Sequence, residues 1–300
     1  MPSIDRRGFL ALGLGALAWA CSRGVDSDDT ADQLGPEAPD PSQAISVVAT
    51  SLIVARGDSR QGFAVFRGQR PFVPDGVKAK IVTPDDEKID VSTDRHRISR
   101  GIGGRSEPTD VTDIFVVRHE FDEPGIWGVE VSFDGGRGEA SFQVLEDSEN
   151  PSPRVGQEAT AVESPTTEDA RGVSPICTRD PACSMHEMTV EEAVTSGKPS
   201  VLVFATPQFC TSRTCGPVVD VVEEQAERFG DDVAFVHIEI WRNDEEAVNK
   251  PPEGWAPAFA AWKFQTEPWV IFVDADGTIK DRWLGTFGSG ELREAVEALR

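Results

Sequence analysis

The hydrophobic pattern differs between the two halves of the chain. Between residues 44 and 146, short runs of β-branched and aromatic residues are separated by Gly, Pro, Asp and Asn, which predicts short strands joined by turns. The stretch "IWGVEVSFDGGRGEASFQV" alternates apolar and polar residues around Gly135-Gly136, which indicates a β-hairpin. Because no cysteine is available to cross-link this part, it must form its own apolar core. We therefore predict a small all-β sandwich.

Residues 176–300 combine strand-like and helix-like patterns. "SVLVFAT" (200–206) and "VAFVHIEIW" (233–241) are continuous apolar runs typical of buried strands, and apolar residues between them recur at helical spacing. Thr189 is followed three residues later by a glutamate, which predicts a capping box at the start of a helix. "WVIFVDADGTIKDRWLG" (269–285) predicts a second hairpin. The pattern is typical of an α/β domain.

Two stretches are too polar to bury a core, and they separate the predicted parts of the chain. We expect the first to be a flexible tether and the second to be a linker. The predicted organisation is a signal peptide (1–20), a tether (21–43), a β-sandwich domain (44–146), a linker (147–175) and an α/β domain (176–300).

The first residues have the pattern of an export signal. Arg6 and Arg7 precede an apolar run that ends at Ala20, which is too short for a transmembrane helix. The adjacent arginines resemble a twin-arginine signal. The residues before Cys21 resemble a lipobox, in which Cys21 would be lipidated, and they also fit ordinary signal cleavage. We favour a lipid-anchored protein on the outer face of the cytoplasmic membrane.

The formal net charge of −23 bears on the partners of the protein. A chain this acidic repels phosphate backbones, so we do not expect it to bind nucleic acid. We expect the membrane itself to be one partner, through the lipid anchor.

Cys210 and Cys215 flank the predicted start of a helix. Pro217 suits the first helical position, which places Cys215 near the helix N-terminus, where partial positive charge stabilises a thiolate. On a continuous helix, two residues five apart would lie about 8.6 Å apart, beyond the ~7 Å limit for a disulfide. The two cysteines can therefore form a disulfide only if the four residues between them are not regular helix.

Several stretches resemble known families. "VLVFATPQFC", "CGPVVDVVEEQAERF" and "TEPWVIFVDADGTI" resemble the thioredoxin-like family over residues 176–300, with Pro268 at the family's cis-proline position. The resemblance implies thiol–disulfide exchange through Cys210 and Cys215, with Pro268 against the pair and the backbone of Glu267 positioning a client. "FDEPGIWGVEVSFDG" resembles immunoglobulin-like sandwiches, which makes the predicted fold an Ig-like domain followed by a thioredoxin-like domain.

The resemblance allows two assignments of the attacking cysteine. The family has two residues between its cysteines, and this chain has four. If the preceding strand is aligned with the family, Cys210 corresponds to the family's first cysteine. If "CGP" is aligned instead, Cys215 corresponds to it. We favour Cys210. "TPQFCTSRTC" also resembles peroxiredoxins, but Thr206 lies four residues before Cys210 rather than three, and Pro268 stands where that family has an arginine.

Cys177 and Cys183 form a second pair, in "ICTRDPACSMHE". We expect a structural disulfide between them, since exported proteins commonly carry such cross-links. A relay role is one alternative. Another is a zinc or copper site that combines Cys183, His186 and other cysteines. We interpret His237, within a predicted strand, as a core residue, and we expect no resident metal or cofactor.

These observations predict a membrane-anchored thiol–disulfide oxidoreductase that acts on exported proteins through a C-x4-C pair. Its expected partners are exported protein thiols and disulfides and a membrane or extracellular redox partner. The first alternative is a non-enzymatic extracellular adaptor with structural disulfides. A peroxiredoxin-type peroxidase and a copper-delivery protein are further alternatives.

Overall fold

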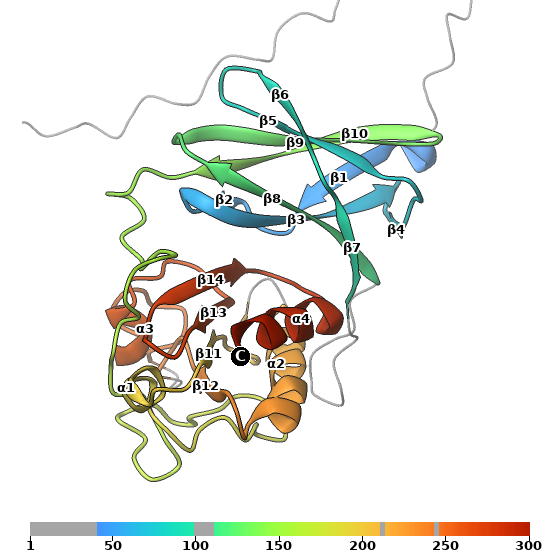
Figure 1. Ribbon diagram of the computed structural model, residues 1–300. Coiled ribbons are helices and arrows are strands. Elements are labelled where there is room, and N and C mark those ends of the chain that lie inside the picture. Colours follow the sequence, from blue (N-terminus) through green and yellow to red (C-terminus); the bar gives the residue numbers. More distant parts are fainter. Residues whose placement is uncertain (1–40, 99–110, 211–213, 243–245) are drawn as a thin grey trace, which may run out of the picture. The chain divides into compact units, whose positions relative to one another are not determined.

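The computed structural model describes residues 41–98, 111–210, 214–242 and 246–300 (Figure 1). Contacts gather residues Asp40–Arg300 into one compact unit, so the predicted division into two domains is not confirmed. The described part consists mostly of β-sheets with a few helices. The predicted signal peptide and nearly all of the predicted tether, with Arg6, Arg7 and Cys21, lie outside the described residues.

The described residues between 44 and 146 form two five-stranded sheets. Apolar side chains from both sheets, among them Phe63, Ile81, Phe121 and Trp127, form one buried cluster. The predicted hairpin around Gly135 is present, with Gly136 paired with Phe133. The first sheet contains β1 (Ile45–Ala49), β3 (Gly57–Arg67), β4 (Arg70–Phe72), β7 (Asp94–Arg97) and β8 (Asp113–Phe121), and the second contains β2 (Ile53–Val54), β5 (Lys78–Val82), β6 (Lys88–Val91), β9 (Gly125–Phe133) and β10 (Gly136–Val144).

This arrangement confirms the all-β architecture, because two sheets share one core. The immunoglobulin-like assignment of this part is not confirmed and stays a prediction.

A third sheet, of four strands, organises the C-terminal part, in the order β12-β11-β13-β14. The strand β11 pairs in parallel with β12 and antiparallel with β13, which in turn pairs antiparallel with β14. Its elements are α1 (Val190–Thr195), β11 (Ser200–Phe204), α2 (Cys215–Phe229), β12 (Ala234–Ile238), α3 (Pro257–Ala261), β13 (Trp269–Val273), β14 (Ile279–Leu284) and α4 (Ser289–Leu299).

Helices cover both faces of this sheet (Figure 1). Successive strand residues point to opposite faces, so Leu202 and Phe204 pack with α1 and α3 while Val201 and Val203 pack with α2 and α4. Burial on both sides explains why β11, β12 and β13 are continuous apolar runs in the sequence.

Two local predictions for this part are confirmed and one is corrected. Thr189 caps α1 through a complete capping box, and Gly277 lies in the turn between β13 and β14. Pro217 is the third residue of α2 rather than the first, because the helix begins at Cys215. A proline is tolerated there since the first four N–H groups of a helix have no intrahelical partner.

Candidate functional site: two cysteine clusters

The two cysteines of the C-x4-C motif lie after β11 and at the start of α2, as the sequence predicts. Cys210 is partly exposed in the loop after the strand, and Cys215 is the first residue of α2 and is fully buried. Residues 211–213, which join them, lie outside the described residues. Neither cysteine takes part in a disulfide bond with another described residue.

The helix N-terminus is directed at Cys210. The backbone N–H of Cys215 donates to Cys210 Sγ over 3.4 Å. A donor and the positive end of the helix dipole both favour the thiolate form of Cys210. Burial raises the pKa of the Cys215 thiol well above its usual value, and its hydrogen bond with Cys210 raises it further. Burial therefore disfavours a thiolate at Cys215, while the N-terminus of α2 faces the sulfur of Cys210.

Glu267 joins this pair and makes the first cluster. One of its carboxylate oxygens and the two sulfur atoms of Cys210 and Cys215 all lie within 4.8 Å of one another. Burial, followed by the charge of Cys210, raises the pKa of Glu267 to about 7. The family resemblance implied a role only for the backbone of Glu267, so its side chain is a site residue that was not predicted from the sequence.

Pro268 follows Glu267 and directly precedes β13. It is buried, and the Glu267–Pro268 peptide bond is cis. Because β13 pairs antiparallel with β11, Trp269 lies opposite Phe204. This pairing brings the start of β13 to the end of β11 from which the chain runs to Cys210.

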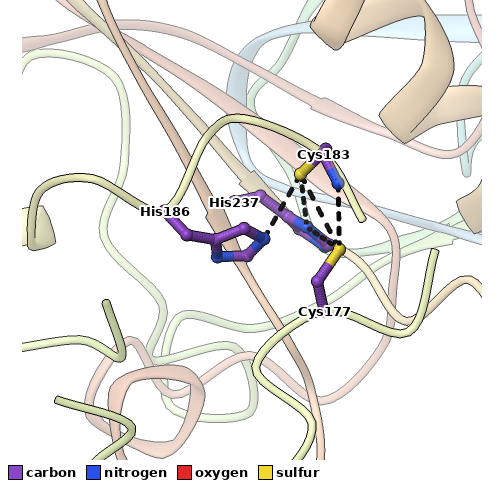
Figure 2. Close-up of side chains that lie close together, drawn as sticks. All are labelled: Cys177, Cys183, His186 and His237. Carbon is purple, nitrogen blue, oxygen red and sulfur yellow. Dashed lines mark hydrogen bonds between the residues drawn. The ribbon is translucent and has the colours of Figure 1, made fainter. Parts of the chain in front are cut away.

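A second cluster contains Cys177, Cys183, His186 and His237, and all four residues are buried. Figure 2 shows the four side chains pointing toward one another, with His237 coming from β12. The sulfur atoms of Cys177 and Cys183 lie 3.8 Å apart, whereas a disulfide bond measures about 2.05 Å. The structure thus holds free thiols where the sequence analysis expects a disulfide.

The imidazoles contact these sulfur atoms directly. His186 Nε2 lies 3.2 Å from Cys183 Sγ, and His237 Nδ1 lies 3.3 Å from the same atom and 3.7 Å from Cys177 Sγ. The pKa of the Cys177 thiol is lowered, chiefly by its hydrogen bond with Cys183 and also by those with the two histidines. His237 is buried as predicted, but its membership of this cluster was not predicted from the sequence.

The segment of residues 177–186, which carries Cys177, Cys183 and His186, is attached to the sheet and to α2. The backbone N–H of His237 donates to the carbonyl of Met185 over 2.9 Å. The carboxylate of Glu239, just after β12, accepts from the backbone N–H and the hydroxyl of Thr178, at 2.5 and 2.8 Å. On the side of α2, Glu223 accepts from the Ser184 N–H over 3.0 Å.

The segment also contacts the loop that leads to Cys210. The hydroxyl of Thr178 accepts a hydrogen bond from the backbone N–H of Gln208 over 3.1 Å. Thr178, the residue next to Cys177, therefore contacts a residue two positions before Cys210. This hydrogen bond, from a backbone N–H to a side-chain hydroxyl, links the segments that carry the two cysteine clusters.

Comparison with known proteins gives only distant structural likenesses. No protein-family profile and no curated protein matches the chain. A solved thioredoxin-like superfamily protein matches with a TM-score of 0.31 and 16% identity, over 39% of this chain and 87% of the other. A thiol:disulfide interchange protein from Chlorobium tepidum matches with a TM-score of 0.31 and 14% identity, over 48% and 99%. The M1 domain of titin matches with a TM-score of 0.20 and 7% identity, over 34% and 91%.

Within residues 41–98, 111–210, 214–242 and 246–300, no helix has both the length and the apolar character needed to cross a bilayer.

Proposed function

We propose that this protein is a membrane-anchored thiol–disulfide oxidoreductase that acts on exported proteins, with Cys210 as the attacking and Cys215 as the resolving cysteine. The observation that carries the proposal is the hydrogen bond from the Cys215 N–H to Cys210 Sγ at the N-terminus of α2. This hydrogen bond stabilises a thiolate at the partly exposed sulfur of Cys210. Its partner Cys215 is buried.

Reduction of a client proceeds in two exchanges. The Cys210 thiolate attacks one sulfur of the client disulfide, the client S–S bond breaks, and one client thiolate leaves. Cys215 then attacks Cys210 Sγ, which releases the second client thiolate and leaves a Cys210–Cys215 disulfide. The pair loses two electrons and the client gains two. The same steps in reverse oxidise a client dithiol.

Glu267 supplies the proton chemistry of the second exchange. The buried Cys215 thiol must lose its proton before it attacks, and a carboxylate lies within 4.8 Å of its sulfur. Because the pKa of Glu267 is raised to about 7, this carboxyl group can accept a proton near neutral pH. The proton then passes to solvent or to the leaving client thiolate. The backbone at Glu267 and Pro268 would position the client.

The proposed location rests on the N-terminal sequence. Arg6 and Arg7 would direct export, and lipidation of Cys21 would hold the protein on the outer face of the cytoplasmic membrane. The acidic net charge of −23 agrees with a protein partner rather than a nucleic acid.

Trapping experiments test the roles of the two cysteines. With a disulfide-containing model protein as client, we expect Cys215→Ser to accumulate a mixed disulfide through Cys210, because the resolving step is removed. We expect Cys210→Ser to form no such adduct and to lose exchange activity. Nonreducing electrophoresis and mass spectrometry of the linked peptides provide the readout. A Cys210→Ser variant with full exchange activity would refute the proposal.

A redox titration in glutathione buffers tests whether the pair is suited to exchange. We expect the Cys210–Cys215 disulfide to open between roughly −120 and −270 mV, the range of known exchange proteins. Alkylation of free thiols, followed by mass spectrometry, assigns the potential to this pair. A potential below about −300 mV would indicate a structural cross-link instead.

A further inference from the structure

The buried cluster of Cys177, Cys183, His186 and His237 has the composition and size of a metal site. Its four donor atoms, two sulfurs and two imidazole nitrogens, all lie within 4.8 Å of one another. Each donor comes from a side chain that is at least nine-tenths buried. Two thiolates and two imidazoles form a donor set that proteins use for tetrahedral Zn²⁺.

The distances between donors agree with one shared ion. Zn–S bonds of about 2.3 Å and Zn–N bonds of about 2.0–2.1 Å, at tetrahedral angles, place two sulfurs about 3.8 Å apart and a sulfur and a nitrogen about 3.5 Å apart. The sulfurs of Cys177 and Cys183 are 3.8 Å apart. The three sulfur–nitrogen contacts measure 3.2, 3.3 and 3.7 Å. The side chains therefore need little movement to enclose a zinc ion.

The hydrogen bonding of His237 directs a lone pair into the cluster. Its Nε2 lies 3.1 Å from the backbone carbonyl oxygen of Ala205, which can only accept. Nε2 therefore carries the proton, and Nδ1, which faces both sulfur atoms, carries the free lone pair. Metal-binding histidines commonly have this arrangement, in which the second ring nitrogen donates to a carbonyl or carboxylate.

A disulfide would satisfy the cluster less well than a metal. If Cys177 and Cys183 were bonded to each other, their sulfurs would offer no proton to the buried Nδ1 of His237. A buried acceptor without a donor is costly. A divalent ion instead binds both nitrogen lone pairs and both thiolates. Its two positive charges balance the two thiolates, so the buried ligand set carries no net charge.

We propose that Cys177, Cys183, His186 and His237 bind one Zn²⁺ ion as a closed structural site. When the ion binds, the two thiols lose their protons to solvent and four metal–ligand bonds form. Because four protein ligands complete a tetrahedral shell, no position is left for a substrate, which distinguishes this site from a catalytic zinc centre.

The ion would fasten a segment that has little regular structure of its own. Residues 177–186 contain no helix or strand, yet they supply three of the four ligands. The fourth ligand, His237, belongs to β12. Zinc would therefore clamp this segment to the sheet, and through Thr178 and Gln208 it would support the loop before Cys210.

The test uses the full chain in which Cys21, Cys210 and Cys215 are all changed to Ser. Only Cys177 and Cys183 then remain, so the result does not depend on the proposed exchange activity. Metal-free, reduced protein is titrated with Co²⁺, whose visible absorption reports tetrahedral geometry and whose near-ultraviolet bands report thiolate ligands. We expect one Co²⁺ per chain, displaced by one Zn²⁺.

Ligand variants made in the same background locate the site. His186→Gln and His237→Gln should each weaken Zn²⁺ binding at least about tenfold and alter the Co²⁺ spectrum, whereas His96→Gln, in the β-sandwich, should change neither. Circular dichroism checks that each variant is folded. If the more deeply buried His237 variant does not fold, the His186 variant decides the question. Unchanged Co²⁺ spectra in folded ligand variants would overturn the proposal.

Three further measurements also decide the assignment. With Zn²⁺ at about 100 times its dissociation constant, the melting temperature should rise by roughly 5–10 °C, and it should fall again with a chelator. Binding of Cu(I) without any binding of Zn²⁺ or Co²⁺ would overturn the assignment to zinc. A Cys177–Cys183 disulfide that forms in air despite saturating Zn²⁺ would overturn it as well.

Discussion

At the residue scale, Glu267 should make the stability of the protein depend on pH. Its pKa is about 7 in the folded chain and lies near 4.5 in the unfolded chain, because burial and the charge of Cys210 disfavour the carboxylate. The folded state binds more protons between these values, so the contribution of Glu267 to stability falls as the pH rises from about 4.5 through 7. We expect Glu267→Gln to stabilise the reduced protein more at pH 8 than at pH 5.

Melting temperatures of the variant and the parent at both pH values provide the measurement. Glu253→Gln, at an exposed position of the same part of the chain, is the matched control. A stability difference between Glu267→Gln and parent that is the same at pH 5 and pH 8 would contradict the assigned pKa.

The roles of Glu267 and His237 mark the limit of what the sequence can predict. Strand periodicity correctly predicts that His237 is buried, because it lies within a continuous apolar run. What its ring contacts depends on Cys177 and Cys183, which lie 60 and 54 positions away. A local pattern holds no information about such distant partners. The available signal was a C-x5-C-x2-H motif combined with a histidine in a buried strand.

At the scale of elements, the capping box of α1 should make a measurable contribution. The Thr189 hydroxyl accepts from the Glu192 N–H over 3.0 Å, and the Glu192 carboxylate accepts from the Thr189 N–H over 2.8 Å. We expect Thr189→Ala to lower the free energy of unfolding by about 1 kcal/mol, measured by urea denaturation. Thr195→Ala, at the exposed end of the same helix, should stay within about 0.5 kcal/mol of the parent. Equal losses in the two variants would argue against the cap.

Elements were predictable where their signals are local. Continuous apolar runs identify β11, β12 and β13, and turn residues identify the two hairpins. The start of α2 was less predictable, because proline is compatible with more than one position of the first turn. The structure begins the helix at Cys215, and this makes the Cys215 N–H available to Cys210.

At the scale of the whole molecule, the net charge of −23 should oppose compactness. Salt screens repulsion between exposed charges, since the Debye length falls from about 10 Å at 0.1 M to about 3 Å at 1 M. We therefore expect the melting temperature to rise as NaCl is increased from 0.05 to about 0.5 M. Calorimetry at fixed pH without chelator provides the readout. A melting temperature that falls over this range would contradict the expectation.

Composition predicts charge effects better than it predicts contacts. Residues 147–175 are polar enough to suggest a free linker, yet part of this segment is hydrogen-bonded beside β14. Gly156 donates to the carbonyl of Ile279, and Ala159 donates to that of Gly277, at 2.8 Å each. Polar side chains do not prevent a backbone from pairing with a sheet edge, because the backbone groups are the same in every residue.

The unequal exposure of the cysteines has a consequence for biogenesis. In the folded chain, an oxidant meets one accessible sulfur among the four described cysteines, that of Cys210, while the other three are buried. In an unfolded chain all four are accessible, and they allow three complete pairings. The order of two events, folding and first contact with an oxidant, therefore decides which bonds the protein contains. If folding comes first, burial protects Cys177, Cys183 and Cys215, and Cys210 is the first described cysteine that an oxidant reaches.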